Sequence, residues 1–303
     1  MENTENIQGK DCFCSKGAGS VMGIIGANGR YGQWLTQFLG RMGRRVIGSD
    51  IGTKLSNEDV VRRADVVIFA VPIAETVRLI KELAPHSRKG QLWMDITSVK
   101  KGPVEAMLES KAEVVGLHPM CAPTVETLRG QIVMFCPARL SQWRSFVDNF
   151  LKSTEATVKE ITPEAHDRQM AMIQCLPHAS ILMMAALLRN MDANVQGLFD
   201  NTSAFYRIVM SLMGRILAQK PELYADIQFH NSDAVLVLEE LEREVGRFKN
   251  MIANGDRPQF LDEFQKSADH FGPEVIDETY NLFDEIIKFV AGEVVKVAAI
   301  RIT

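Results

Sequence analysis

The chain has 303 residues, of which 46% are hydrophobic and 24% charged, a composition typical of a soluble globular protein. Its length predicts two domains, and its formal net charge of −4 argues against a protein that binds nucleic acid through a basic surface. Because no uninterrupted apolar run is long enough to cross a bilayer and residues 1–16 lack the apolar core of a signal peptide, we expect a cytoplasmic protein without a membrane partner.

The first predicted elements are a strand, a tight turn and a helix. Residues 1–20 are polar and aperiodic, so we expect a flexible leader before them. An apolar run at residues 22–25 precedes the closely spaced Gly26, Gly29 and Gly32. The helix that follows has a stripe of apolar residues, namely Trp34, Leu35, Phe38 and Leu39. Glycines in such a turn let a pyrophosphate approach the N–H groups at the positive end of the helix.

An acidic residue ends the next predicted strand. The apolar pair at residues 46–47 leads to Asp50, roughly 20 residues after the glycines, where a carboxylate can accept hydrogen bonds from an adenosine ribose. Asp50 favours a cofactor-binding turn over an ordinary glycine-rich turn. It also favours NAD over NADP, although Arg44 and Arg45 keep NADP open. The spacing departs from G-x-G-x-x-G because Ala27 stands where the first glycine is usual.

Short apolar runs then alternate with helical stretches up to residue 161. The expected strands lie at residues 64–71, 92–96, 114–117, 132–135 and 157–161, the last as an edge strand. The expected helices between them lie at residues 73–83 and 141–150. This alternation predicts an α/β fold, with a Rossmann-type, mostly parallel sheet domain over residues 21–161.

The alternation stops after Thr162, which is placed to cap a helix that begins at Pro163. Residues 162–303 read almost entirely as helix, with breaks near Pro221, at residues 255–258 and at residues 272–273. Residues 235–252 and 273–300 carry apolar side chains at three- and four-residue steps. We expect an all-helical substrate and dimerisation domain whose apolar faces pack against a second subunit in a homodimer.

Ligands of open α/β sheets bind at the carboxyl ends of the strands, which directs attention to three loops. These are residues 71–73, 95–100 and 116–120. His118 is the most informative residue, because it directly follows a predicted sheet strand and its ring could face a nicotinamide. The expected cofactor-binding residues belong to the glycine turn and to the ends of the next two strands: Gly26, Asn28, Gly29, Arg30, Tyr31, Asp50, Val71 and Pro72.

Neither the cysteines nor the histidines indicate a metal site. The five cysteines are scattered, so we expect free thiols. His166 and Asp167 are adjacent rather than on one helix face, and no carboxylate triad or HxxxH spacing accompanies them. We expect His166 at the surface and Asp167 as a partner of its own helix dipole.

Four separated motifs together resemble one family. They are TSVK at residues 97–100, LHPM at residues 117–120, HDRQMAMIQCLPH at residues 166–178, and FYRIVMSLMGRILAQKPELYADI at residues 205–227. In this order they resemble prephenate dehydrogenases of aromatic amino acid biosynthesis, and more narrowly the dehydrogenase half of the chorismate mutase/prephenate dehydrogenase T-protein. The resemblance covers about residues 21–271. We expect no mutase region, because the leader is short.

The resemblance implies an NAD-dependent oxidative decarboxylation of a cyclohexadiene, with hydride leaving C4 and aromatisation as carbon dioxide departs. It implies that His118 accepts the proton or hydrogen bond of the 4-substituent. It also implies that Ser98 lies beside His118 and the nicotinamide. It also implies that Arg207 binds a substrate carboxylate and that His178 faces the substrate side chain. Arg215 and Gln219 follow Arg207 on the same predicted helix, where we expect them to support the substrate site.

Departures from the family pattern leave alternatives open. Relatives commonly have Phe-Gly-Pro after LHPM, whereas this chain has Cys-Ala-Pro at residues 121–123. The ring substituent is therefore open between hydroxyl and amino, that is, between prephenate or arogenate and 4-amino-4-deoxyprephenate. A silent NAD-binding regulatory dimer is a further alternative, against which Ser98, His118 and Arg207 argue together. A β-hydroxyacid dehydrogenase would need a catalytic lysine, which residues 166–188 lack.

Overall fold

The computed structural model describes residues 19–302, and from residue 293 onward the backbone alone. The expected flexible leader falls almost entirely outside the described residues. The chain divides into two compact units, Met1–Met170 and Ala171–Thr303. The first unit therefore continues past residue 161, and His166 and Asp167 belong to the same unit as the sheet.

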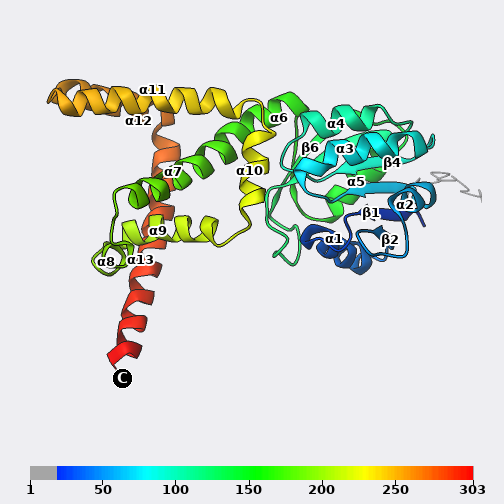
Figure 1. Ribbon diagram of the computed structural model, residues 1–303, viewed down its shortest axis with the longest axis horizontal. Coiled ribbons are helices and arrows are strands. Elements are labelled where there is room, and N and C mark those ends of the chain that lie inside the picture. Colours follow the sequence, from blue (N-terminus) through cyan, green and yellow to red (C-terminus); the bar gives the residue numbers. More distant parts are fainter. Residues whose placement is uncertain (1–18, 303) are drawn as a thin grey trace, which may run out of the picture. The chain divides into compact units, whose positions relative to one another are not determined.

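The first unit is built on a seven-stranded sheet with the order β2-β1-β3-β4-β5-β6-β7 (Figure 1). The strands are β1 (Val21–Ile25), β2 (Arg45–Ser49), β3 (Val66–Phe69), β4 (Leu92–Asp95), β5 (Glu113–Pro119), β6 (Ile132–Arg139) and β7 (Thr157–Glu160). Neighbouring strands pair in parallel except β5 and β6, which are antiparallel. The predicted mostly parallel Rossmann-type sheet is confirmed.

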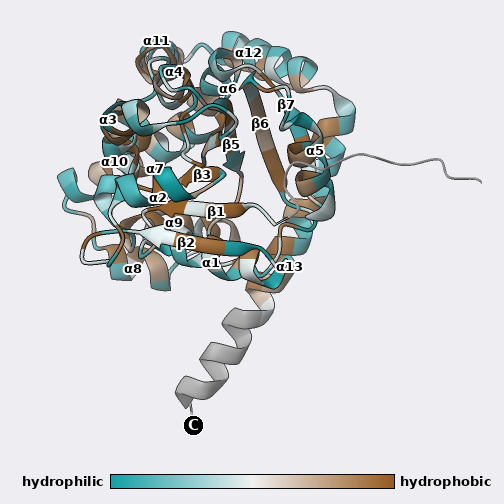
Figure 2. Cartoon of the chain, turned by 90° about the vertical axis from the view of Figure 1, so that its right-hand side faces the viewer, coloured by the Kyte–Doolittle hydropathy of each residue, from teal (hydrophilic) through white to brown (hydrophobic). Residues whose placement is uncertain are grey.

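Helices cover both faces of this sheet. They are α1 (Arg30–Arg41), α2 (Asn57–Arg63), α3 (Ile73–Leu83), α4 (Lys101–Leu108), α5 (Arg144–Ser153) and α6 (Pro163–Met170), with a short 3-10 turn η1 (Ala84–His86) after α3. Side chains alternate along a strand, so Ile24 joins the core beneath α1 and α5, whereas Ile25 joins the core beneath α2, α3 and α4. In Figure 2 the fully buried β3 is brown and the exposed β7 is mostly teal.

The second unit is helical throughout its described length, apart from short connections. It comprises a π-helical turn η2 (Ala171–Cys175), α7 (Leu176–Asn190), α8 (Val195–Asp200), α9 (Ala204–Leu217), α10 (Pro221–Phe229), α11 (Ala234–Ala253), α12 (Arg257–Phe271) and α13 (Pro273–Ile302). The predicted breaks are confirmed, because α10 and α13 begin at prolines and both Gly255 and Gly272 have positive φ. The sequence predicted these breaks correctly because proline and glycine restrict or relax the backbone at their own positions.

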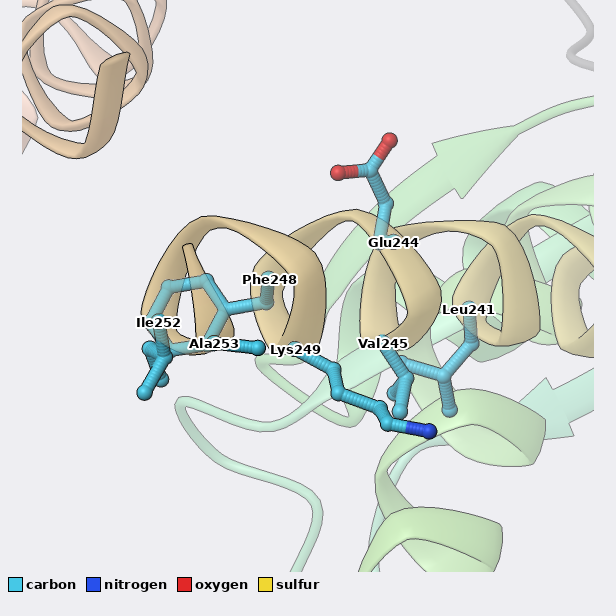
Figure 3. A pocket seen from close by; sticks show the side chains of 7 residues that line it. All are labelled: Leu241, Glu244, Val245, Phe248, Lys249, Ile252 and Ala253. Carbon is cyan, nitrogen blue, oxygen red and sulfur yellow. The ribbon is translucent and has the colours of Figure 1, made fainter. Parts of the chain in front are cut away.

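Long helices of the second unit expose apolar side chains in the single chain. An open pocket along α11, seen in Figure 3, is lined by residues of that one helix: Leu241, Glu244, Val245, Phe248, Lys249, Ile252 and Ala253. Val245 is 59% exposed and Ile252 64% exposed. Exposed apolar surface of this kind is typical of sites that bind another molecule.

One helical stretch of the described chain, Pro163–Asn190, is long and apolar enough to cross a membrane by length and composition. Our expectation counted uninterrupted apolar runs and so missed it, because polar residues such as Gln174 and His178 interrupt this helix. Core helices of soluble proteins pass the same test, but only 11% of the most apolar part of this stretch is buried in the single chain.

Candidate active site

The predicted loops lie along one edge of the sheet. Because β1, β3, β4 and β5 are adjacent and parallel, their carboxyl ends meet there. The glycine turn follows β1, Val71 and Pro72 come after β3, and residues 96–100 follow β4. Strand β5 is longer than predicted, so His118 lies within its carboxyl end rather than after it.

The glycine turn leaves no room for side chains. Gly26 has a φ of +90°, and a Cβ there would lie 2.6 Å from the carbonyl oxygen of Ala70. A Cβ at Gly32 would lie 2.0 Å from the carbonyl oxygen of Gly26, so α1 packs directly on the turn. The helix begins after Gly29, which has no side chain to cap it. The arrangement fits a pyrophosphate bound by the first N–H groups of α1.

The unusual Ala27 is accommodated by a glycine on the neighbouring strand. The N–H groups of Gly26 and Ala27 both donate to the carbonyl oxygen of Ser49, at 2.9 and 3.0 Å. A Cβ at Gly48 would lie 2.5 Å from the Cβ of Ala27. Gly48 therefore makes room for the methyl group of Ala27, and the altered glycine spacing is compatible with a close turn.

The structure brings Asp50 to the glycine turn, as predicted. One carboxylate oxygen accepts from the N–H of Asn28 at 2.8 Å, and the other from the N–H of Ile51 at 2.7 Å. Arg45 begins β2 beside Val21, at the opposite end of the strand. At roughly 3.3 Å per residue, about 17 Å of strand separates Arg45 from Asp50. NADP was kept open because Arg44 and Arg45 are close to Asp50 in sequence. In the structure, Arg45 is not close to Asp50.

Three further expected cofactor-binding residues have different surroundings. Val71 lies against the turn, since a Cβ at Gly26 would meet its Cγ1 at 2.8 Å. Arg30 opens α1 and is exposed. Pro72 is the N-cap residue of α3, and its carbonyl oxygen accepts from the hydroxyl of Thr76 at 2.9 Å.

Helix α1 also holds the loop that follows His118. The Tyr31 hydroxyl donates to the carbonyl oxygen of Cys121, and Trp34 Nε1 donates to that of Val125 at 2.7 Å. Burial, and secondarily the neighbouring Cys121, raises the pKa of Tyr31, so its hydroxyl stays protonated and keeps donating. Tyr31 thus joins the glycine turn to the segment where this chain departs from Phe-Gly-Pro.

His118 is buried and bonded to a second histidine. Its Nδ1 lies 2.9 Å from Nε2 of His166. Within residues 19–302, no hydrogen bond engages its Nε2. Burial, together with His166 and Lys100, holds the pKa of His118 well below its ordinary value. The ring is therefore neutral and can accept a hydrogen bond or a proton.

His166 and Asp167 were not predicted as site residues, and the expected surface position of His166 is wrong. Their side chains are 0% and 7% exposed, and His166 Nδ1 lies 2.7 Å from Oδ1 of Asp167. The role expected for Asp167 is also wrong, because its carboxylate accepts from the N–H groups of Lys100 and Lys101 at the start of α4, at 2.7 and 2.9 Å. A sequence signal existed, since this pair opens one of the family motifs.

A buried ion pair supports the loop after β4. Lys100 Nζ donates to Oδ2 of Asp95, and both side chains are 0% exposed. The same oxygen accepts from the hydroxyl of Thr97 at 2.7 Å. A Cβ at Gly116 would meet Lys100 Cδ at 2.8 Å, so the glycine on β5 makes room for the lysine. The buried bonds of Asp95 to Lys100 and Thr97 therefore hold the TSVK turn in place.

Ser98 lies half-buried in this turn, between the buried Thr97 and Val99. It does not cap α4, because the N-cap residue of that helix is Lys100 and the side chain that bonds its first N–H groups is Asp167.

The substrate-binding candidates all belong to the second unit. On α9, the Arg207 guanidinium donates to the carbonyl oxygen of Phe199 at 3.2 Å and stacks over the Phe199 ring at 4.3 Å. One N–H is used in this bond, and guanidinium carries five donors, so further donors stay available to a carboxylate.

His178, Gln219 and Tyr224 form a cluster in the second unit. The rings of His178 and Tyr224 meet edge to face at 4.9 Å, and Gln219 Nε2 donates to the Tyr224 hydroxyl at 2.9 Å. Gln219 also donates to the carbonyl oxygen of Arg215 at 3.2 Å. Nδ1 of His178 is buried without a hydrogen-bond partner in the described chain, and burial lowers the pKa of this histidine. The cluster thus contains a neutral histidine with an unused polar atom.

Among residues 19–302, no group of three or more His, Cys, Asp or Glu side chains is arranged so that it could hold a metal ion.

Two family models match the chain. Residues 43–160 match the prephenate dehydrogenase nucleotide-binding domain, and residues 162–266 match the prephenate dehydrogenase dimerization domain. The chain belongs to the prephenate dehydrogenase family. This is a family of NAD-dependent oxidoreductases, so the suspected resemblance is confirmed. The nucleotide-binding match begins at residue 43, after the glycine turn.

Curated members of the prephenate dehydrogenase family are similar over most of the chain. A probable arogenate/prephenate dehydrogenase of Methanocaldococcus jannaschii is 35% identical over 86% of this chain and 63% of its own length. A T-protein of Haemophilus influenzae is 32% identical, over 82% and 66% respectively. A 4-amino-4-deoxyprephenate dehydrogenase of Streptomyces pristinaespiralis is 28% identical, over 80% and 89%. The chain thus spans slightly less than two thirds of the first two relatives.

A solved prephenate dehydrogenase has the same fold. The A. aeolicus enzyme, in complex with hydroxyphenyl propionate and NAD⁺, superposes with a TM-score of 0.69 at 19% identity. The similarity covers 82% of this chain and 96% of that one. The arrangement of a nucleotide-binding sheet unit followed by a helical unit is therefore that of prephenate dehydrogenases.

Proposed function

We propose that this chain catalyses the NAD-dependent oxidative decarboxylation of prephenate or a close cyclohexadienyl analogue. The observation that carries the proposal is the buried neutral His118, whose Nε2 has no partner within residues 19–302 and which lies on the sheet edge of the glycine turn. When bound, NAD accepts the hydride that leaves C4 of the ring. The residues of the chain then have to orient the substrate, accept at its 4-substituent and bind its carboxylates.

His118 accepts the hydrogen bond, and then the proton, of the 4-substituent as hydride leaves C4. A neutral imidazole suits this role, and its low pKa keeps it neutral over the working pH range. Ser98, half-buried in the turn at the end of the neighbouring β4, positions the same substituent.

Arg207 binds a substrate carboxylate through its unused guanidinium donors, which supplies about 1.5 to 3 kcal/mol as well as orientation. His178 binds the substrate side chain through its unpartnered Nδ1. Gln219 and Arg215 fix the Tyr224 hydroxyl beside it.

The cofactor is NAD rather than NADP. Asp50, which lies at the glycine turn, would bind the ribose hydroxyls, and a 2′-phosphate there would face a like charge. Gly26, Asn28, Gly29, Arg30, Tyr31, Val71 and Pro72 are the other proposed cofactor contacts. The narrow turn, which any Cβ at Gly26 or Gly32 would fill, supports this assignment.

The protein is a homodimer through its helical unit, with a small molecule as its other partner. The match to a dimerization domain and the exposed apolar side chains of α7 and α11, among them Met183, Leu187 and Phe248, support this proposal. A second subunit also covers the apolar Pro163–Asn190 stretch, which is consistent with a cytoplasmic enzyme that binds neither membrane nor nucleic acid.

The substituent at C4 decides between the candidate substrates. An imidazole acceptor serves a hydroxyl or an amine equally, so His118 does not discriminate. The Cys121 segment, which Tyr31 holds, is where the sequence departs from the expected Phe-Gly-Pro, and one relative is a 4-amino-4-deoxyprephenate dehydrogenase. Oxidation of the 4-amino compound is therefore the second candidate function.

A side-by-side assay tests the proposal. NADH or NADPH formation is followed with prephenate, arogenate and 4-amino-4-deoxyprephenate, each with NAD and with NADP. We expect NADH from prephenate or its 4-amino analogue. If NAD binds but none of the three substrates is turned over, the enzyme proposal fails and a silent NAD-binding regulatory dimer replaces it.

A further inference from the structure

Three ionisable side chains form one continuous hydrogen-bonded chain inside the first unit. It runs from His118 Nδ1 to His166 Nε2 over 2.9 Å, and from His166 Nδ1 to Asp167 Oδ1 over 2.7 Å. It ends at the N–H groups of Lys100 and Lys101, which donate to the two Asp167 oxygens. His118 on β5 and His166 on α6 are 48 residues apart in sequence, so their contact depends on tertiary packing.

The protons of this chain can be assigned from the Asp167 end. Both Asp167 oxygens accept hydrogen bonds from backbone N–H groups at the start of α4, so the side chain acts as an acceptor at both oxygens. His166 Nδ1 must then carry a proton and donate it to Asp167. Neutral His166 offers a lone pair at Nε2, so His118 Nδ1 carries a proton as well. The remaining nitrogen, His118 Nε2, is left as an acceptor.

The surroundings also decide where a positive charge is tolerated. His118 is 4% exposed, and the Lys100 ammonium, paired with Asp95, already lies nearby. A cation on His118 would therefore be poorly solvated and would face another cation. His166, by contrast, contacts the Asp167 carboxylate directly. The second histidine of the relay therefore has a carboxylate partner, which His118 lacks within residues 19–302.

We propose that His166 and Asp167 are positioning residues that fix the tautomer of His118 and take up the proton it receives. The inference rests on the proposed function. As hydride leaves C4 for NAD, the 4-hydroxyl proton moves to His118 Nε2 while the Nδ1 proton of His118 moves to His166 Nε2. When the bond from the ring to the carboxylate breaks, carbon dioxide leaves and its electron pair aromatises the ring. The phenolate oxygen then takes the proton back, and the relay is reset.

The tautomer is tested directly by nitrogen NMR of the full chain labelled with ¹⁵N-histidine, without substrate. We expect His118 to be protonated at Nδ1 and bare at Nε2, with His166 protonated at Nδ1. In Asp167→Asn the side-chain amide cannot accept all three hydrogen bonds, so the His118 signal should change its tautomer. A wild-type His118 protonated at Nε2 overturns the proposal, whatever the outcome of the activity assays.

Kinetics test the proton movement. His166→Gln keeps an oxygen that can accept from His118 Nδ1, but it cannot take a proton. We expect kcat to fall about 10² to 10³-fold, with KM changed less than threefold. A proton inventory in mixtures of H₂O and D₂O should be curved for the wild type, which moves two protons, and linear for His166→Gln.

Glu164→Gln is the matched control, because Glu164 is an exposed acid on the same helix. It should leave kcat and the His118 tautomer unchanged. Thermal unfolding of each variant separates misfolding from loss of the relay. If folded His166→Gln and Asp167→Asn retain wild-type kcat, the relay is wrong although the dehydrogenase function stands. If the wild type turns over no substrate, the proposed function fails, and the NMR tautomer still decides the positioning role.

Discussion

His118 Nδ1 lies 2.9 Å from His166 Nε2, and this buried bond joins β5 to α6 across 48 residues of sequence. It sets which nitrogen of His118 is available for chemistry. Both histidines belong to the first unit, and the effect of this bond on His118 can be tested by the variants below.

The first prediction concerns pH. Burial, with His166 and Lys100, lowers the pKa of His118. Asp167 is bonded to His166, and Asp95 is paired with Lys100. An acceptor must be neutral, so kcat/KM should stay level as the pH falls through about 6.5 and decline only below it. A profile measured from pH 5 to 9 checks this, and an acid limb at or above pH 6.5 contradicts it.

The same shift affects stability, with a sign that follows from proton uptake. The unfolded chain takes up a proton on His118 at a higher pH than the folded chain does. The contribution of His118 is therefore fully present above about pH 6.5 and is lost as the pH falls towards the lower folded value. Urea unfolding at several pH values measures this slope, and His118→Asn should reduce it.

The second prediction concerns the glycine turn. In Gly48→Ala the new methyl would collide with Ala27, which should cost about 1 to 3 kcal/mol of stability and weaken NAD binding. The double variant Ala27→Gly/Gly48→Ala should recover both. Gly40→Ala is the control, because a Cβ there meets nothing within 4 Å. Equal NAD affinity in Gly48→Ala and Gly40→Ala would refute the compensation.

The placement of His118 and Asp50 was predictable because both follow from strand ends, which apolar runs mark locally. The roles of His166 and Asp167 were not. In a helix, adjacent residues point in different directions, so His166 and Asp167 were not expected to act together. The helical pattern also carries no information about contacts with His118, 48 residues away. Asp167 likewise bonds the start of α4 rather than its own helix. Such contacts depend on tertiary packing, as does the room that Gly48 gives Ala27.

The third prediction concerns cofactor choice. Asp50→Asn removes the charge that opposes a 2′-phosphate, so the ratio of NADP to NAD use should rise about tenfold, or about 1.4 kcal/mol. Arg45→Ala should leave this ratio unchanged, since Arg45 lies at the far end of β2. Steady-state kcat/KM with each cofactor measures it. A loss of NADP use in Arg45→Ala would show that the arginine reaches the cofactor after all.

The fourth prediction concerns Arg207. Replacing it by alanine should raise the apparent KM for substrate by about 10 to 100-fold, which corresponds to a lost charged hydrogen bond of about 1.5 to 3 kcal/mol. Arg207→Lys should recover only part of this affinity, because lysine lacks the bidentate fork. Arg62→Ala, an exposed arginine on α2, serves as the control. An unchanged KM in Arg207→Ala would remove the carboxylate role.

The central claim is that His118 does chemistry on the substrate and leaves cofactor binding to the glycine turn. It is tested most directly by measuring NADH formation and NAD affinity on the same preparations of wild type, His118→Asn and the exposed control His230→Asn. We predict that His118→Asn lowers kcat about 10² to 10⁴-fold while its NAD affinity stays within twofold of the wild type. Wild-type turnover by a folded His118→Asn protein would contradict the account.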